Sequence, residues 1–239
     1  MKPLIGITAE IREGNYFLPP IYSKVVIQAG GIPVLIPQIP DEDIQEMCNQ
    51  IDALLVTGGE DIDPGYYGQE PHVDLGIITP RLDRMEYLLV QEFLKQDKPY
   101  IGICRGLHML NVVNGGSLYQ SIHTEREKEV IQHKQKAPRT HRAHTVKLEK
   151  DSRMFELLGE DEFKVNSFHH QACNKVPDSL KIVATAKDGI IEGVESPEHS
   201  FVFGFQWHPE EFAWDGDEPS QHLFKSFIDA AVKRKELNR

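Results

Sequence analysis

The sequence lacks three features that would each point to a class of protein: a cysteine framework, a long apolar run and an excess of basic residues. Its 239 residues include three cysteines, and this small, odd number predicts reduced thiols and a cytoplasmic location rather than a disulfide scaffold. No apolar run approaches the roughly 18 residues of a membrane-spanning helix. Glu10 and Arg12 follow the first short apolar stretch too closely for a signal peptide. We therefore expect no membrane partner.

Basic charge is in the minority, with 26 Lys and Arg against 37 Asp and Glu and a formal net charge of −11. Nucleic acids and anionic membranes bind to basic faces, so neither is an expected partner. The locally basic stretch 128–142 has no interleaved aromatic residues and is interpreted as a solvated loop. The chain does have 40% hydrophobic and 26% charged residues, which is typical of a globular protein with a sizeable core.

Short apolar runs alternate with amphipathic segments through the first two thirds of the chain. This alternation predicts βαβ units and a mainly parallel sheet whose strands are buried on both faces. Strands are expected over 3–9, 32–37, 51–57 and 99–103, and helices over 18–29, 41–50, 81–95 and from the turn after Cys104 to Asn114.

Strands dominate the second part of the chain. Segment 123–141 is polar and aperiodic, which predicts a long loop or lid. The expected elements after it are strands over 143–148, 163–168, 181–186, 190–195 and 201–206, a hairpin turn at Asp188-Gly189 and a closing helix over 220–235. Since neither a repeat nor a linker interrupts the pattern, a single α/β domain over residues 1–239 is the simplest expectation.

The most informative segment is K-P-Y-I-G-I-C-R-G-L (98–107), in which a buried strand runs into a small-residue turn and a helix. Such a turn exposes Cys104 at the carboxyl end of the sheet, as the nucleophile elbow of α/β hydrolases exposes its serine. The N-terminus of the following helix favours thiolate over thiol. An inert, buried core cysteine is the alternative interpretation.

A second segment, F-V-F-G-F-Q-W-H-P-E-E (201–211), ends an apolar strand with His208 and Glu210. Residues two apart on an extended chain point the same way, so Glu210 could orient the ring of His208. A thiol nucleophile needs such a base and such an orienting group. A plain surface turn is the alternative interpretation.

A third strand, L-L-V-T, ends in Gly58-Gly59 at what should be the same edge of the sheet. A backbone N–H freed at this turn could stabilise an oxyanion. The N–H of Arg105, which follows the nucleophile, is the natural second donor. A Gly-Gly turn after a strand is common, so this signal depends on the other two segments.

Together, G-I-C-R-G-L, W-H-P-E and V-T-G-G-x-D-I-D-P resemble class I glutamine amidotransferase-like hydrolases, and most closely the γ-glutamyl-γ-aminobutyrate hydrolase branch. Further matching stretches cover nearly the whole chain in order, namely R-L-D-R-M-E, N-G-G-S-L-Y-Q-S-I, H-R-A-H-T-V, V-N-S-F-H-H-Q-A and D-G-I-I-E-G-V-E. The resemblance implies a flavodoxin-like α/β fold, a three-layer sandwich around a mainly parallel sheet. It also implies a triad of Cys104, His208 and Glu210, with oxyanion N–H groups from Gly59 and Arg105.

The resemblance further implies where a small γ-glutamyl substrate is held. Many relatives carry Gln four residues after the nucleophile, whereas this chain has His108, which leaves the grip on the α-carbon end of the substrate open. The other residues that the resemblance places beside the site are Gly58, Arg81, His169, His170 and Gln171. Each of them could contact substrate or have only a structural role.

Eleven histidines raise the question of a metal site. His141 and His144 lie three apart and His169 and His170 are adjacent, but no set of three or four ligands with the spacing of a zinc site is apparent. We therefore expect no metal, and the chemistry implied by the resemblance requires no cofactor.

The leading hypothesis is hydrolysis of a γ-glutamyl amide to glutamate and an amine. The resemblance implies γ-glutamyl-γ-aminobutyrate, from putrescine breakdown, as substrate, and Arg81, Arg105 and the loop 128–142 are candidates for binding its carboxylate. A glutaminase subunit that feeds ammonia to a partner synthase is the alternative. A non-catalytic protein on the same fold is a third possibility, against which the complete triad counts. A homodimer is one assembly that the sequence leaves open.

Overall fold

The central feature of the computed structural model, which describes residues 1–237, is a nine-stranded sheet. Its strands lie in the order β4-β1-β5-β6-β13-β12-β11-β8-β9. They are β1 (Leu4–Thr8), β4 (Ile32–Ile36), β5 (Ala53–Val56), β6 (Tyr100–Ile103), β8 (His144–Leu148), β9 (Glu162–Val165), β11 (Lys181–Ala186), β12 (Ile191–Glu195) and β13 (Val202–Phe205). Neighbours from β4 to β13 pair in parallel, and neighbours from β13 to β9 are antiparallel.

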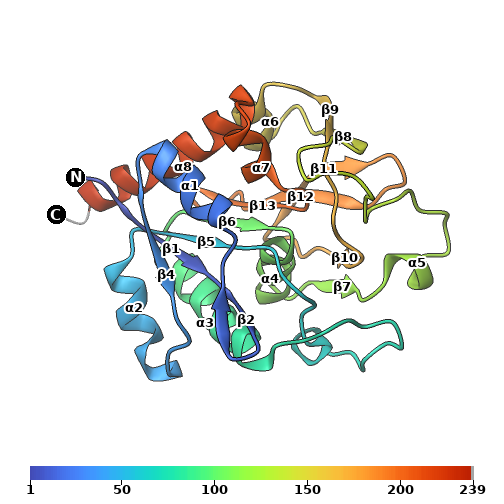
Figure 1. The fold of residues 1–239 in the computed structure, drawn as a ribbon, viewed down its shortest axis with the longest axis horizontal. Helices are drawn as coiled ribbons and strands as arrows, with labels where there is room; N and C mark the ends of the chain where they lie inside the picture. Colours follow the sequence, from blue (N-terminus) through green and yellow to red (C-terminus); the bar gives the residue numbers. More distant parts are fainter. Residues whose placement is uncertain (238–239) are drawn as a thin grey trace.

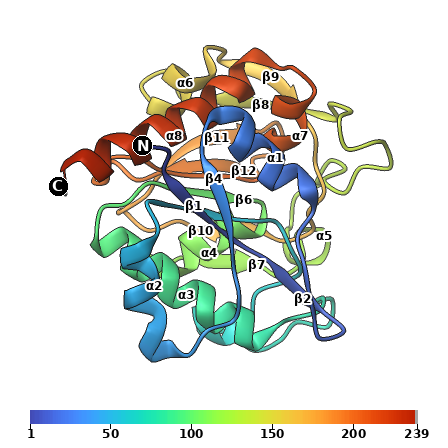
Figure 2. The same ribbon diagram turned by 60° about the vertical axis from the view of Figure 1, so that its left-hand side comes forward.

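Helices cover both faces of this sheet, which makes three layers (Figures 1 and 2). On one face lie α1 (Pro20–Ala29), α6 (Arg153–Leu158), α7 (Pro209–Trp214) and α8 (Glu218–Leu237), and on the other lie α2 (Ile44–Gln50), α3 (Pro80–Lys95) and α4 (Arg105–Val113). The smaller elements are the hairpin of β2 (Glu10–Arg12) and β3 (Asn15–Phe17), the pair β7 (Ser117–Tyr119) and β10 (Ala172–Lys175), helix α5 (Ile122–Glu125) and 3-10 turns at Asp41–Asp43 and Pro64–Tyr67. None of the described helices has the length and apolarity to cross a membrane.

Burial in the central strands follows from their composition. Every residue of β5, β6 and β13 is buried, because helices cover both sides of these apolar strands. Helix α8 buries one stripe of its surface, as its helical spacing predicts, and the stripe consists of Leu223, Phe224, Phe227, Ile228 and Ala231. The expected three-layer, flavodoxin-like α/β class is confirmed.

The sheet is more mixed than the sequence pattern indicated. Strands β8, β9, β11 and β12 run antiparallel to their neighbours, and the hairpin turn at Asp188-Gly189 joins two of them. Burial patterns reveal a strand but not its direction, so only the hairpin turn could indicate antiparallel pairing. The strands β2, β3, β7 and β10 were not predicted, because three or four residues are too few to show a periodicity.

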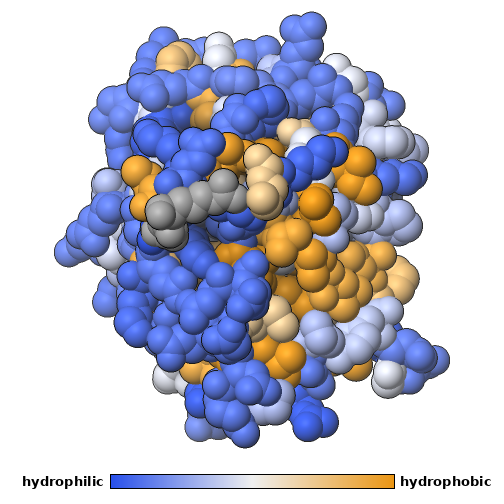
Figure 3. All heavy atoms as spheres, turned by 90° about the vertical axis from the view of Figure 1, so that its left-hand side faces the viewer, coloured by the Kyte–Doolittle hydropathy of each residue, from blue (hydrophilic) through white to orange (hydrophobic). Residues whose placement is uncertain are grey.

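One edge of the sheet carries an apolar surface. β4 is the edge strand, and its residues Ile32, Val34 and Leu35 are all exposed. Figure 3 views the molecule from this side and shows apolar side chains gathered there. Edge strands offer unpaired backbone groups to a second chain. The homodimer that the sequence leaves open stays a prediction.

Candidate active site

Cys104 lies at the sharp turn between β6 and α4, at the carboxyl end of a central strand. Its backbone has φ 52° and ψ −104°, a region that residues other than glycine rarely occupy. The residue is only 6% exposed and directly precedes the first turn of α4. The structure therefore has the strained strand–turn–helix geometry that the sequence predicts at this position.

Two glycines allow the strand and the helix to meet at this turn. A Cβ at Gly102 would lie 2.4 Å from the backbone carbonyl group of Gly106, and one at Gly106 would lie 2.3 Å from the carbonyl oxygen of Val56. Backbone atoms cannot rotate away as a side chain can, so we expect Gly102→Ala to destabilise the protein by about 1–3 kcal/mol. For a chain of this size that lowers the Tm by roughly 2–12 °C, which thermal unfolding by circular dichroism would measure.

The control for this prediction is Gly65→Ala, in an exposed turn. A Cβ there would meet only the side chain of Asp63, at 3.1 Å, so we expect a change within about 0.5 kcal/mol. A Gly102→Ala variant that melts at the same temperature as the wild type would show that β6 and α4 are less closely packed than described.

His208 and Glu210 follow β13 and lie beside Cys104. Nδ1 of His208 is 2.7 Å from Oε1 of Glu210, and both side chains are buried. A Cβ at Gly58 would lie 3.0 Å from the ring of His208 and 3.5 Å from Cβ of Cys104, so the two side chains flank the same glycine. Burial lowers the pKa of His208, but Glu210 and Cys104 outweigh burial and raise the pKa to about 9. The ring can therefore carry a proton at neutral pH.

Two residues that sequence reasoning missed hold this group in place. The side chain of Asn166 accepts a hydrogen bond from the His208 N–H (2.8 Å) and donates one to the His208 carbonyl oxygen (3.1 Å). The hydroxyl of Tyr22 accepts a hydrogen bond from the N–H of Gly58 at 3.1 Å. Burial and the charge of Glu210 raise the pKa of Tyr22 well above its usual value, so it stays a neutral phenol.

The backbone N–H groups of Gly59 and Arg105 are free to bind an anion. Within residues 1–237, neither N–H has a hydrogen-bond acceptor. The N–H of Gly58, in contrast, is taken up by Tyr22 and is not available to substrate. Gly59 lines the same pocket as Cys104, and Arg105 is the next residue in the chain. These two N–H groups can therefore donate to an oxyanion.

The side chain of Arg105 forms ion pairs with two carboxylates. Its guanidinium is buried and donates to the carboxylates of Asp83 and Glu86 on α3. Burial lowers the pKa of Arg105, but the two carboxylates outweigh burial and raise it. This ion group ties the start of α4 to α3. It also removes the Arg105 side chain from the candidates for binding a substrate carboxylate.

His108, the fourth residue after the nucleophile, is linked to Cys104 through another side chain. Its Nε2 lies 2.7 Å from Oε1 of Gln206, and Nε2 of Gln206 lies 3.7 Å from Sγ of Cys104. Burial lowers the pKa of His108 to about 4, so the ring is neutral at pH 7. His108 therefore orients Gln206 toward the thiol and adds no charge to the site.

Cys104 lines a pocket of about 340 Å³, whose wall also includes His108, His169, His170 and Gln171. The structure thus gathers most of the candidate substrate-binding residues in one place.

Arg81 is an exception, because it lines a different surface hollow together with Gln38 and Arg84. The reason is helix geometry. Asp83 faces inward toward Arg105, and a residue two positions away lies about 200° around the helix.

The predicted loop 123–141 is a loop except at its start, where residues 123–125 belong to α5. The long loop that remains, 126–143, contains neither helix nor strand and borders the pocket. Lys134 from this loop lines the pocket. Nη2 of Arg139 lies 3.1 Å from Nδ1 of His208, and its guanidinium lies 4.6 Å from the ring centre of Phe168. The loop therefore brings two cationic side chains to the site.

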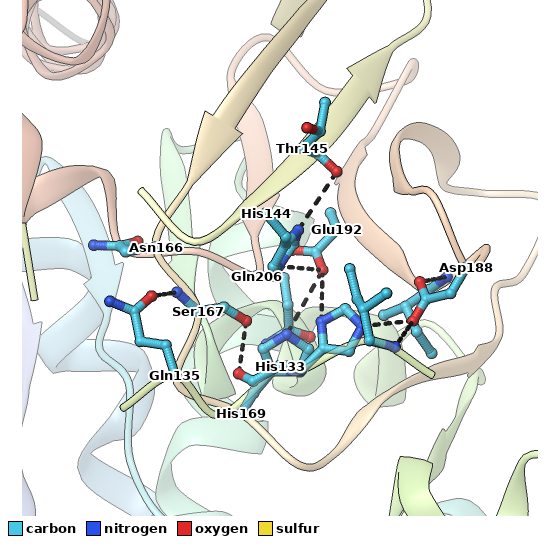
Figure 4. Close-up of polar contacts among 12 residues, drawn as sticks. His133, Gln135, His144, Thr145, Asn166, Ser167, His169, Asp188, Glu192 and Gln206 are labelled. Carbon is cyan, nitrogen blue, oxygen red and sulfur yellow. Dashed lines mark hydrogen bonds and ion pairs between the residues drawn. The ribbon is translucent and has the colours of Figure 1, made fainter. Parts of the chain in front are cut away.

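The expectation that the histidines form no ligand set needs correction. Four buried residues, His133, His144, His169 and Glu192, bring nitrogen and oxygen atoms within 4.8 Å of one another (Figure 4). His133 lies in the long loop and His144 begins β8. His169 follows β9, and Glu192 lies in β12. No local spacing rule could find them, because no two of them belong to one short motif.

Comparison with known proteins supports a family assignment for this geometry. Residues 3–210 match the family model described as Peptidase C26. Protein NtpR of Enterococcus hirae is 38% identical, over 95% of this chain and 99% of that protein. Gamma-glutamyl-gamma-aminobutyrate hydrolase PuuD of Escherichia coli K12 is 31% identical, over 87% of this chain and 84% of that protein. The glutaminase domain of Trypanosoma brucei CTPS, with bound acivicin, shares the fold with a TM-score of 0.65 at 16% identity, over 97% of this chain and 94% of that chain. The chain therefore belongs to the Peptidase C26 family of class I glutamine amidotransferase-like proteins.

Proposed function

We propose that this protein uses Cys104 to hydrolyse γ-glutamyl amides to glutamate and an amine. The observation that carries the proposal is the grouping of a thiol on a strained turn, the buried ring of His208 beside it, and Glu210, 2.7 Å from the far nitrogen of that ring. A nucleophile, a base and a group that orients the base are what acyl transfer through a thioester requires. Membership of a hydrolase family supports the same reaction class.

In the proposed reaction, the thiolate of Cys104 attacks the δ-carbonyl carbon and the carbonyl electron pair moves onto oxygen. The N–H groups of Gly59 and Arg105 stabilise that oxyanion. When it collapses, the C–N bond breaks and protonated His208 gives its proton to the leaving amine, which leaves a glutamyl thioester. His208 then takes a proton from water, whose oxygen attacks the thioester. Breaking the C–S bond releases glutamate and restores the thiolate.

The substrate that we propose is γ-glutamyl-γ-aminobutyrate, by analogy with the named Escherichia coli relative. Its leaving amine carries a carboxylate, which a cation near the pocket would recognise. Lys134 supplies such a cation in the pocket wall. A charge-assisted hydrogen bond of about 1.5–3 kcal/mol corresponds to roughly 10- to 150-fold in kcat/KM.

We expect the isolated chain to hydrolyse γ-glutamyl-γ-aminobutyrate with a kcat/KM at least about tenfold above that for free glutamine. Glutamate release by the purified protein, measured for a panel of γ-glutamyl compounds, tests this. Lys134→Met should reduce the preference, because methionine keeps the length and loses the charge. Lys136→Met is the matched control, since Lys136 is exposed on the same loop and does not line the pocket.

A glutaminase subunit that supplies ammonia to a partner synthase is the competing function. Relatives named as putative glutamine amidotransferases and the same glutamyl chemistry support it equally well. The two functions differ in their dependence on a second protein. A preference for glutamine, or hydrolysis that begins only when a partner is added, would favour the glutaminase subunit over the stand-alone hydrolase.

A further inference from the structure

Four buried side chains converge on one point between the long loop and the sheet (Figure 4). Oε1 of Glu192 lies 3.3 Å from Nδ1 of His133, 3.5 Å from Nε2 of His144 and 3.6 Å from Nε2 of His169. The side chain of His144 is 7% exposed, and the other three are 2% exposed or less. The group is therefore sealed from solvent.

None of the atoms that face the centre has a hydrogen-bond partner among residues 1–237. They are Nδ1 of His133, Nε2 of His144, Nε2 of His169 and both carboxylate oxygens of Glu192. Buried polar atoms are almost always paired, so several unpaired atoms at one point indicate a missing partner.

In each histidine, one ring nitrogen faces Glu192 (the inner nitrogen) and the other points away from it (the outer nitrogen). The partners of the outer nitrogens show which tautomer each histidine adopts. Nε2 of His133 lies 2.9 Å from the Asp188 carboxylate, and Nδ1 of His169 lies 2.8 Å from the carbonyl oxygen of Gln171. Nδ1 of His144 lies 3.4 Å from the carbonyl oxygen of Thr145. These oxygens only accept hydrogen bonds, so the outer nitrogens carry the protons. A neutral imidazole has one N–H, so its inner nitrogen presents a lone pair.

The centre of the group therefore lacks a positive charge. Three lone pairs and a carboxylate face one another there.

We propose that His133, His144, His169 and Glu192 bind one zinc ion. Zinc bonds to imidazole nitrogen and carboxylate oxygen are about 2.0–2.2 Å long, and a tetrahedron of that size has edges of about 3.3–3.6 Å. The three distances from Glu192 fall in this range, and all four ligand atoms lie within 4.8 Å of one another. Four protein ligands leave no open position, as in structural zinc sites.

The surroundings fit a bound cation as well. Asp188 and the carbonyl oxygen of Gln171 hold two of the histidines in the form that a metal needs, as outer partners do in known sites. The two positive charges of the ion are balanced by Glu192 and Asp188, so the buried group is neutral overall. Imidazole and carboxylate ligands in a closed tetrahedral set favour zinc over calcium or magnesium.

A hydrogen-bond network without metal is the competing explanation. It would need extra protons on the inner nitrogens, in buried rings whose outer nitrogens are already protonated. Charged N–H···O bonds are usually about 2.7–2.9 Å long, and all three contacts to Glu192 are longer than that. A metal ion in the centre accounts for this separation.

The ion would fasten the long loop to the sheet, because His133 belongs to the loop and Glu192 to β12. The residues after two of the ligands reach the active-site pocket. Lys134 lines that pocket, and so does His170, which lies 2.7 Å from Asp61. The zinc is thus a structural staple that positions the pocket wall without touching a reacting atom.

The full-length protein, purified without a chelator and without a histidine tag, tests the proposal. We expect about one zinc per chain by mass spectrometric metal analysis. Removing zinc with dipicolinate should lower the Tm and speed tryptic cleavage within 126–143, and added Zn²⁺ should reverse both. Co²⁺ in place of zinc should give the visible absorption of a tetrahedral site. None of these measurements depends on hydrolase activity.

Variants sharpen the test. Glu192→Gln keeps the shape and removes the charge, so we expect loss of stoichiometric zinc. Asp188→Asn should weaken zinc binding about 10- to 100-fold. His123→Ala, exposed on α5, is the control that keeps its zinc. The proposal is overturned if the wild type contains far less than one zinc per chain and neither Zn²⁺ nor Co²⁺ shifts its Tm. If a variant fails to fold, the zinc content of the wild-type protein and its Co²⁺ spectrum decide the question.

Discussion

Replacing Cys104 with alanine is expected to lower kcat for a γ-glutamyl amide by at least about 10⁴-fold while the fold stays intact. Without sulfur no thioester can form, and water must attack the amide directly. Alanine has the same Cβ on the same strained backbone, so the Tm should change little. A coupled glutamate assay measures turnover. Intact-protein mass spectrometry of acid-quenched reactions should show a glutamyl adduct on the wild type and none on the variant.

The other two cysteines provide the control. Burial raises the pKa of Cys48 to about 12 and also raises the pKa of Cys173, so neither thiol is nucleophilic near neutral pH. Iodoacetamide should therefore label Cys104 alone, and Cys48→Ala should remain active. Full activity of Cys104→Ala, or a glutamyl adduct on Cys173, would contradict the proposed mechanism.

The second large effect concerns the base. His208→Ala is expected to lower kcat by about 10⁴-fold, because nothing then protonates the leaving amine. Glu210→Gln should lower kcat by about 10²- to 10⁴-fold, because the His208 ring keeps a hydrogen-bond partner but loses the compensating negative charge. Steady-state kinetics with an alkyl γ-glutamyl amide measure both losses.

The pH profile gives an independent reading of the same pair. His208 must be protonated to release the amine, and its pKa is raised to about 9, so kcat/KM should fall as the pH rises through about 9. Glu210 is one cause of that raised pKa. In Glu210→Gln the fall should therefore begin at lower pH. Asp215→Asn, at the exposed C-terminal end of α7, is the control that should keep the wild-type profile. An identical profile in Glu210→Gln would mean that Glu210 does not act on the ring.

The parts of the fold that the sequence predicted are those with a local cause. The strands β5, β6 and β13 are continuous apolar runs, and α8 shows a helical stripe, so each can be recognised in isolation. Strand direction in the second half of the sheet depends on pairing partners far along the chain. The sequence carries little local information on that.

The same distinction applies to the site. Cys104 could be singled out because strand, turn and helix are contiguous, and His208 with Glu210 because the two lie on one extended segment. Asn166 and Tyr22 could not, since each reaches the site from a distant element. The four proposed zinc ligands were missed for the same reason, because tertiary folding alone brings them together.

The positive φ of Cys104 has an evolutionary implication. A residue other than glycine in such a backbone conformation costs the fold on the order of 1–3 kcal/mol, and glycine would relieve that strain. Selection for stability alone would therefore drive this position toward glycine, and a lineage that no longer needed the thiol could gain stability by losing it. The cysteine thus occupies a place where the backbone favours another residue, and its presence there argues that the sulfur is used.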